Sequence, residues 1–204
     1  MNLDSEISRL LDLMPATGRM LTKIVSRPQQ SKVIDTPFPM PWERGLRPVF
    51  INFDLWKQLS RPERDLTLLR GVSVLTGVRW FKPDIYQGIT LAGLVGLTAQ
   101  IVQGDAVGIV VAGALTAIAG NRVWRTNRTL EREITADEEA IKVAIRRGYT
   151  QTEASRQLLN AIETIAKIEG RQSLSFTELI RSQNLKTMGN LSPVGVPDIV
   201  RQED

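Results

Sequence analysis

The longest apolar stretch of the chain lies in its middle, in the segment Gly88–Gly120, where Asp105 is the only charged residue. The Gly-Asp pair at 104–105 separates two apolar stretches of eighteen or nineteen residues, roughly Tyr86 to Gln103 and Ala106 to Trp124. As helices they would reach about 27–29 Å, close to the ~30 Å hydrocarbon thickness of a bilayer. Gly-Asp is typical of a turn between antiparallel helices. The pattern predicts an apolar helical hairpin over residues 85–124, and favours a transmembrane hairpin over one buried in a soluble helical domain.

Basic and aromatic residues flank both ends of this apolar stretch. Positive charge at both outer ends predicts that both lie on the cytoplasmic side, and aromatic side chains there are typical of a membrane interface. Small residues four positions apart, such as Gly88, Ala92 and Gly96, let two helices approach closely. The predicted membrane-interface anchors are Arg79, Trp80, Lys82, Arg122, Trp124 and Arg125.

Residues 1–48 predict an amphipathic helix followed by a Pro-rich connector. The apolar residues that recur at helical spacing are Leu3, Ile7, Leu10, Leu11 and Met14. A cap at Asp4 or Ser5 would begin this helix. We expect it to pack on the rest of the protein rather than on a membrane surface, because its polar face is partly acidic. From Pro15 to Pro48 turn formers are frequent, and the prolines prevent a continuous helix.

Residues 49–84 predict a strand and then a long helix. The alternation of apolar and polar positions in Val49–Phe53 is typical of a β-strand, and Asp54 is a candidate cap for a helical turn after it. A Ser-x-x-Glu capping box formed by Ser60 and Glu63 then begins the long helix. Its expected apolar face contains Leu66, Leu69, Val72 (or Ser73) and Leu75 (or Thr76).

Residues 125–188 form a polar region with three predicted helices, and 189–204 an irregular tail. The apolar stripe of the first helix is Leu130, Ile134, Ile141 and Ile145. The second helix begins at the capping box Thr150–Glu153 and ends at Gly170, and the third runs from near Ser175 to about Asn184. The chain as a whole predicts a mostly α fold with a small β element, built as a helical membrane-associated domain around the central hairpin.

The amino-acid composition excludes several kinds of chemistry. The 204 residues include neither Cys nor His, which excludes disulfides, thiolate nucleophiles, His-ligated zinc and Ser-His or Cys-His pairs. A net charge of +4 and a pI near 9.7 permit an acidic partner. Lys and Arg are scattered along the chain rather than grouped in a stripe, so nucleic-acid binding is disfavoured.

Six segments together resemble an uncharacterised cyanobacterial family, domain of unknown function 3318. They are "LMPATGRM", "INFDLWKQLSRPERDLTLLR", "GVRWFKP", "QGDAVGIVVAGALTAIAG", "ADEEAI" and "SFTELIR". The resemblance covers nearly the whole chain. It implies a cyanobacterial lineage and a compartment, the thylakoid or plasma membrane, but no activity.

The order of elements also resembles membrane zinc endopeptidases of the heat-shock and CAAX-processing type. Those have a strand, a helix with His-Glu-x-x-His, a transmembrane hairpin, and a helix with Glu-x-x-Ala-Asp. The last motif is present here as Glu133 to Asp137, and the resemblance implies a third zinc ligand at Glu133 and a supporting role for Asp137. The first motif is absent, since Arg70 and Val74 stand at the histidine positions and Gly71 at that of the general base. We call these five residues the vestigial site, with a metallopeptidase-like helix arrangement around it.

An ion pair between Arg70 and Glu133 would occupy the place of the metal and stabilise the helix packing without catalysis. In the alternative interpretation, Glu133 and Asp137 are solvent-facing carboxylates with Arg128 and Arg132 as neighbours one turn away.

The sequence therefore predicts a non-catalytic, membrane-anchored protein with no metal and no cofactor. It would act as a pseudo-metallopeptidase-like scaffold or as an accessory or assembly factor that binds membrane lipid and other membrane proteins, or a larger photosynthetic complex. Residues 129–170 would form the docking surface. Two alternatives are a soluble cytoplasmic regulatory or nucleic-acid-binding module, and an enzyme that uses carboxylates alone, such as Glu133 with Asp137 or Asp54. The sequence leaves the oligomeric state open.

Overall fold

The computed structural model describes residues 2–40, 45–77, 114 and 130–191. All of these except residue 114 belong to one compact unit of the two into which the chain divides, and we call this unit the body. Apart from residue 114, the predicted hairpin over 85–124 lies outside the described residues, as do all six predicted interface anchors. Among the helices that are described, none is long and apolar enough to cross a membrane.

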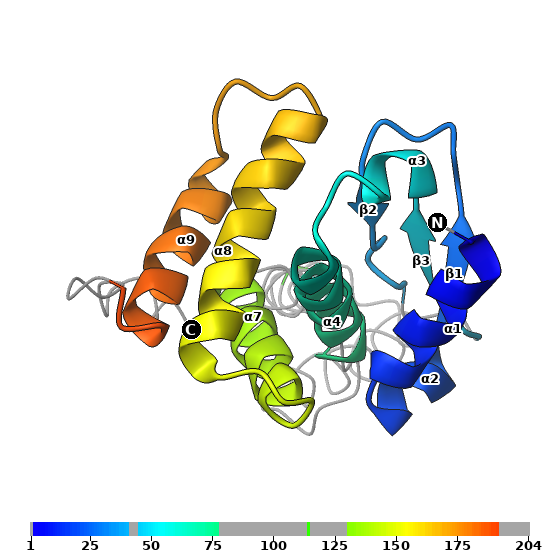
Figure 1. Ribbon diagram of the computed structural model, residues 1–204, viewed down its shortest axis with the longest axis horizontal. Helices are drawn as coiled ribbons and strands as arrows, with labels where there is room; N and C mark the ends of the chain where they lie inside the picture. The colour runs from blue at the N-terminus through cyan, green and yellow to red at the C-terminus, as the bar shows by residue number, and fades with distance from the viewer. Residues whose placement is uncertain (1, 41–44, 78–113, 115–129, 192–204) are drawn as a thin grey trace, which may run out of the picture. The chain divides into compact units, whose positions relative to one another are not determined.

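The body is mostly helical with a small three-stranded sheet, as predicted (Figure 1). Its helices are α1 (Leu3–Leu13), α2 (Ala16–Leu21), α3 (Phe53–Trp56), α4 (Arg61–Gly77), α7 (Leu130–Ile145), α8 (Gln151–Ile168) and α9 (Phe176–Met188), and its strands are β1 (Thr22–Ser26), β2 (Ile34–Asp35) and β3 (Arg47–Ile51).

The sheet has the order β1-β3-β2. β1 runs parallel to β3, with Thr22 opposite Arg47 and Ser26 opposite Ile51, and the two residues of β2 pair antiparallel with β3. The prediction of a connector up to residue 48 was therefore incomplete, because this region also holds α2 and two strands. Both strands are short and complete their hydrogen bonds only against β3, a partner distant in sequence, so no local pattern marks them.

Asn2 and Asn52 cap two of the N-terminal helices. The Asn2 side chain accepts a hydrogen bond from the Asp4 N–H at the start of α1. The Asn52 side chain accepts from the N–H groups of Asp54 and Leu55, so β3 ends at Ile51 and α3 begins directly after it. The predicted caps at Asp4 or Ser5 and at Asp54 were wrong by two residues or more, because an asparagine just upstream already satisfies the free N–H groups.

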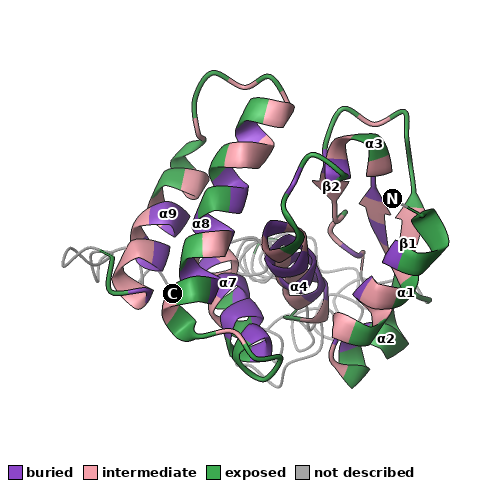
Figure 2. Cartoon of the chain, viewed as in Figure 1, coloured by how far each residue is buried: buried purple, intermediate pink, exposed green. Residues whose placement is uncertain are grey.

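α4 lies between two groups of elements (Figure 1). It packs against α7 and α8 on one side and against α1, α2 and β3 on the other. Its predicted apolar residues Leu66, Leu69, Val72 and Leu75 are all buried, and Figure 2 shows buried residues along most of its length. The capping box that begins α4 is confirmed by hydrogen bonds from the Ser60 N–H to Glu63 (2.7 Å) and from the Glu63 N–H to the Ser60 hydroxyl (3.5 Å). α4 is therefore the central helix of the body.

Two apolar clusters meet at α4. The first contains Leu66 and Leu69 together with residues of α7, α8 and α9, among them Ala140, Ile141, Leu158, Ile162 and Leu185. The second contains Leu68, Val72 and Leu75 together with Leu10, Met14, Val33, Val49, Ile51, Trp56 and Leu59. Gly18 lets α2 approach the second cluster closely, because a Cβ there would lie 2.6 Å from Cγ1 of Val72.

α8 and α9 begin at their predicted residues. Thr150 caps α8, which ends before Gly170, a residue with a φ of 70° that suits glycine. Ser175 and Glu178 form a full capping box at the start of α9, which runs four residues further than expected, to Met188. Ile145 does not belong to the buried stripe, since its side chain is 42% exposed at the end of α7.

Candidate functional site

α4 and α7 bring three of the five vestigial-site residues together. Arg70 on α4 forms an ion pair through Nη2 with Oε2 of Glu133 on α7. Its Nε lies 3.6 Å from Oδ1 of Asp137, one turn further along α7. A guanidinium group therefore lies against both carboxylates of the Glu-x-x-Ala-Asp motif.

A second arginine, Arg181 on α9, binds the same aspartate. Its Nε and Nη2 each donate a hydrogen bond of 2.8 Å to an oxygen of Asp137. Asp137 is fully buried and Arg181 is 7% exposed. This two-point geometry is the strongest form of a guanidinium–carboxylate contact. Arg181 is not among the site residues predicted from the sequence, because spacing along the chain gives no measure of the distance between α7 and α9.

Gly71 and Val74 do not join this cluster in the described contacts. A Cβ on Gly71 would lie 3.1 Å from Cγ2 of Thr36 and 3.4 Å from Cδ1 of Ile34, so this position faces the β2 segment. Val74 is partly buried. The solvent-facing interpretation of the two carboxylates is wrong for Asp137, which is fully buried, whereas the Glu133 side chain is 33% exposed.

Burial and charge act in opposite directions on Arg70. Burial, and then repulsion from Arg181, lower the pKa of Arg70 to about 10, while the charges of Asp137 and Glu178 oppose the shift. Arg70 therefore stays protonated at neutral pH. Its positive charge is available to balance the carboxylates of α7.

In the part of the chain that the structure describes, no group of three or more His, Cys, Asp or Glu side chains is placed to hold a metal ion. The oxygens of Glu133 and Asp137 accept from guanidinium groups instead. Asp54, the other carboxylate considered from the sequence, lies on α3, where it forms an exposed pair with Lys57 at 3.1 Å.

A cavity of about 390 Å³ lies beside this cluster. Leu158, Ala161 and Ile162 of α8 give it an apolar wall, and the arginines Arg70, Arg171 and Arg181 line its polar side. Each of the three carboxylates in its lining is ion-paired, and the pairs are Asp35 with Lys32, Glu169 with Arg171, and Glu178 with Arg171. Within the described residues, the buried Thr67 hydroxyl of this cavity has no hydrogen-bond partner. The polar side of the cavity thus consists largely of arginines and carboxylates that are engaged in ion pairs.

Glu178 predicts a change of stability with pH. Burial raises its pKa, but hydrogen bonds from Arg171 and Ser175 outweigh this and lower the pKa from 4.5 to about 2. A folded-state pKa below the unfolded value gives stability that is present above pH 4.5 and is lost as the pH falls toward 2. We expect Glu178→Gln to lower the free energy of unfolding at pH 6 and to have no effect near pH 2. Urea unfolding of both proteins across this range measures the difference, and a difference independent of pH would contradict the assignment.

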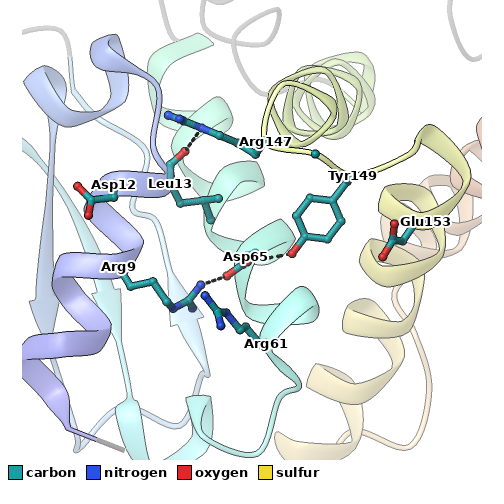
Figure 3. Close-up of a pocket in the computed structure, with 9 residues that line it drawn as sticks. Arg9, Asp12, Leu13, Arg61, Asp65, Arg147, Tyr149 and Glu153 are labelled. Carbon is teal, nitrogen blue, oxygen red and sulfur yellow. Dashed lines mark hydrogen bonds and ion pairs between the residues drawn. The ribbon is translucent and has the colours of Figure 1, made fainter.

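A second polar cluster joins α1, α4 and the turn after α7 (Figure 3). Tyr149 donates a hydrogen bond of 2.9 Å to Oδ2 of Asp65, and Arg9 forms an ion pair with Oδ1 of the same residue. Arg147 donates to the backbone oxygens of Leu13 (3.2 Å) and Met14 (3.0 Å). Burial, and then the contact with Asp65, raise the pKa of Tyr149 to about 12, so the phenol remains a donor at neutral pH. Residues of this cluster line a cavity of about 490 Å³. Their contacts connect α1 with the turn after α7.

Glu6 lies at the buried end of the same network. It is 6% exposed and accepts hydrogen bonds from Arg9 (2.9 Å), Arg64 (2.8 Å) and the indole N–H of Trp56 (3.3 Å). Burial raises the pKa of Glu6, but the contacts with Arg9, Trp56 and Arg64 outweigh it and lower the pKa. This network was not predicted from the sequence, because Glu6 has the spacing of an ordinary residue on the polar face of α1.

We expect energetic coupling between Arg70 and Glu133. In a double-mutant cycle with Arg70→Ala and Glu133→Ala, the double variant should lose less stability than the sum of the single losses, with a coupling of about 0.5–3 kcal/mol. Denaturant unfolding of the four proteins measures it. Additive losses would show that the ion pair contributes nothing to stability.

Comparisons with known proteins agree on the lineage of the chain. It is 26% identical over 166 residues to a protein of Synechocystis sp. that is named as a thylakoid membrane protein, and the alignment covers 79% of this chain and 76% of that relative. No solved structure matches the chain. The resemblance to membrane zinc endopeptidases stays a prediction. The model of the family "Protein of unknown function (DUF3318)" matches residues 8–149. This match covers more than half of the chain, which therefore belongs to the DUF3318 family.

Proposed function

We propose that this protein is a non-catalytic, membrane-associated scaffold whose helical body binds other membrane proteins. The proposal that the protein is non-catalytic rests on the pairing of Asp137 with Arg181. Asp137 is fully buried and accepts two hydrogen bonds from Arg181. A carboxylate in this state is poorly suited to catalysis, because it is closed to solvent and both of its oxygens already accept hydrogen bonds from Arg181.

The three ion-paired carboxylates in the adjoining cavity also argue against an enzyme that uses carboxylates alone. Such an enzyme needs an acid and a base with separated pKa values and access to substrate. Here Glu178 has a pKa of about 2, far below the range in which it would exchange protons near neutral pH.

Membrane association is supported by the relative named as a thylakoid membrane protein and by the apolar segment predicted from the sequence over residues 85–124. For the partner we propose another protein or a photosynthetic complex of the same membrane, with both termini of the chain on the cytoplasmic side. Phe176 and Leu179, one turn apart on α9, are 70% and 54% exposed, and large exposed apolar side chains are typical of protein contact sites.

Extraction of washed membranes tests the proposal. We expect the full chain to stay with the membranes through a high-salt and alkaline carbonate wash and to be released by detergent. Recovery in the soluble fraction after mild lysis would overturn membrane association and favour a soluble regulatory module. Metal analysis of the detergent-purified protein tests the non-catalytic part, and stoichiometric zinc would overturn it.

A further inference from the structure

Three large apolar side chains are exposed at one end of the sheet. Leu21 directly precedes Thr22, the first residue of β1, and Leu46 directly precedes Arg47, the first residue of β3. Thr22 and Arg47 are partners in a parallel pair, so Leu21 and Leu46 lie at the same end of the sheet. Met20 adjoins Leu21 at the end of α2. We call Met20, Leu21 and Leu46 the apolar edge.

The exposure of the apolar edge is high for such residues. Met20 is 74% exposed, Leu46 55% and Leu21 38%. Single exposed apolar residues are common on soluble proteins, but a group of them in one place marks a contact with another apolar phase.

The charges beside the apolar edge are positive. The segment Pro15–Ile34 contains four basic residues and no acidic residue. Arg19 and Lys23, which flank Met20 and Leu21 in sequence, are both exposed. Exposed apolar side chains between basic residues match an anionic lipid surface, where each Lys or Arg near the headgroups contributes about 1 kcal/mol.

The chain leaves the body at this same end. Arg47 donates a hydrogen bond through Nη1 to the backbone oxygen of Leu75, so the start of β3 contacts the last turn of α4. Arg132 of α7 donates to the backbone oxygen of Gly77 at 2.6 Å, which brings the start of α7 to the end of α4. Gly77 and the start of α7, the described residues on either side of 78–129, therefore lie near each other and near the start of β3.

We infer that the apolar edge, with Arg19 and Lys23, is a lipid-contacting surface that rests on the headgroups of an anionic bilayer. This inference rests on the membrane association proposed above and assigns to that association a specific face of the body. The exposed apolar pair Phe176 and Leu179 on α9 serves as the reference.

The absence of cysteine from the chain allows a direct test. The single variants Met20→Cys, Leu46→Cys and Phe176→Cys of the full chain are labelled with an environment-sensitive fluorophore. They are then reconstituted in vesicles of phosphatidylcholine with phosphatidylglycerol, with and without doxyl-labelled lipid. Since all three positions are exposed, these substitutions should leave the fold intact. We expect a blue shift and at least twofold quenching by doxyl lipid at positions 20 and 46, and no quenching at position 176.

Charge provides the second arm of the test. The pair of substitutions Arg19→Gln and Lys23→Gln, made in the Met20→Cys protein, should reduce the quenching at position 20 in phosphatidylglycerol vesicles. For the Met20→Cys protein without these substitutions, vesicles of phosphatidylcholine alone should reduce the quenching at position 20 by the same amount. Unchanged quenching in both cases would overturn the role of anionic lipid.

The outcomes separate the inference from the proposed function. If the chain fails to float with the vesicles, membrane association itself is wrong. If it floats with the vesicles but the probes at 20 and 46 are no more quenched than the probe at 176, the chain is membrane-bound and the inferred surface is wrong. A blue shift at 20 and 46 without quenching by doxyl lipid would indicate a protein contact at this edge and would also overturn the inference.

Discussion

Replacing Asp137 by asparagine is expected to lower the free energy of unfolding by about 3–5 kcal/mol. Asp137 is fully buried and balances the charge of Arg181, which donates two hydrogen bonds of 2.8 Å to it. Asparagine has nearly the same shape but no charge, so the buried guanidinium group of Arg181 would remain without its counter-charge. The nearby Arg70 would lose part of its compensation as well, since its Nε lies 3.6 Å from Asp137. Denaturant unfolding of the detergent-solubilised full chain, followed by circular dichroism, measures the loss.

Glu139→Gln is the matched control for Asp137→Asn. Glu139 lies on the same helix and forms an ion pair of 2.8 Å with Lys142, but both side chains are about half exposed or more. Exposed pairs of this kind contribute about 0–1 kcal/mol. Equal losses for the two variants would show that Asp137 is not the buried counter-charge inferred here. Replacing both Asp137 and Arg181 by leucine should cost less than the sum of the single replacements, because neither charge is then left alone.

Trp56→Ala is the second substitution with a large expected effect, a loss of about 3–5 kcal/mol. The Trp56 side chain is fully buried in the cluster that joins α1, the sheet and α4. Alanine leaves a large cavity at this junction and also removes the indole N–H that donates to Glu6 at 3.3 Å. Denaturant unfolding of the full chain again measures the change.

Trp56→Phe separates packing from the hydrogen bond. Phenylalanine keeps most of the apolar volume, and Glu6 retains its contacts with Arg9 and Arg64. We therefore expect Trp56→Phe to lower the free energy of unfolding by less than Trp56→Ala does, by about 1–2 kcal/mol. A loss as large for phenylalanine as for alanine would mean that the contact with Glu6, rather than the packing, makes Trp56 important.

The sequence predicted best the elements whose signals are local. The capping boxes at Ser60 and Ser175 and the cap at Thr150 each involve residues three positions apart, and all begin helices as expected. Apolar spacing within α4 likewise identified Leu66, Leu69 and Leu75 as buried. Such signals are satisfied within one turn or one helix face and need no knowledge of the rest of the chain.

The features that the sequence did not predict depend on partners that are distant in the chain. β1 and β2 exist because β3 completes their hydrogen bonds. Of the candidate site, Arg70, Glu133 and Asp137 were named from an alignment of motifs, whereas Arg181 binds Asp137 across 44 positions of sequence. Asp65 with Arg9 and Tyr149 is a similar case, since these contacts span 56 and 84 positions. No local pattern encodes which charges meet after packing.

The packing of α4 also determines the order in which this protein can fold as it is synthesised. Leu66 and Leu69 share their apolar cluster with Ala140, Leu158 and Leu185, which the ribosome adds more than seventy residues later. Until α9 has emerged, this side of α4 has no complete partner, and its apolar residues are exposed to any competing surface. The N-terminal part of the nascent chain therefore cannot complete its packing while residues 78–129 pass through the exit tunnel. We expect the emerging N-terminal part to depend on chaperones during this interval to avoid aggregation.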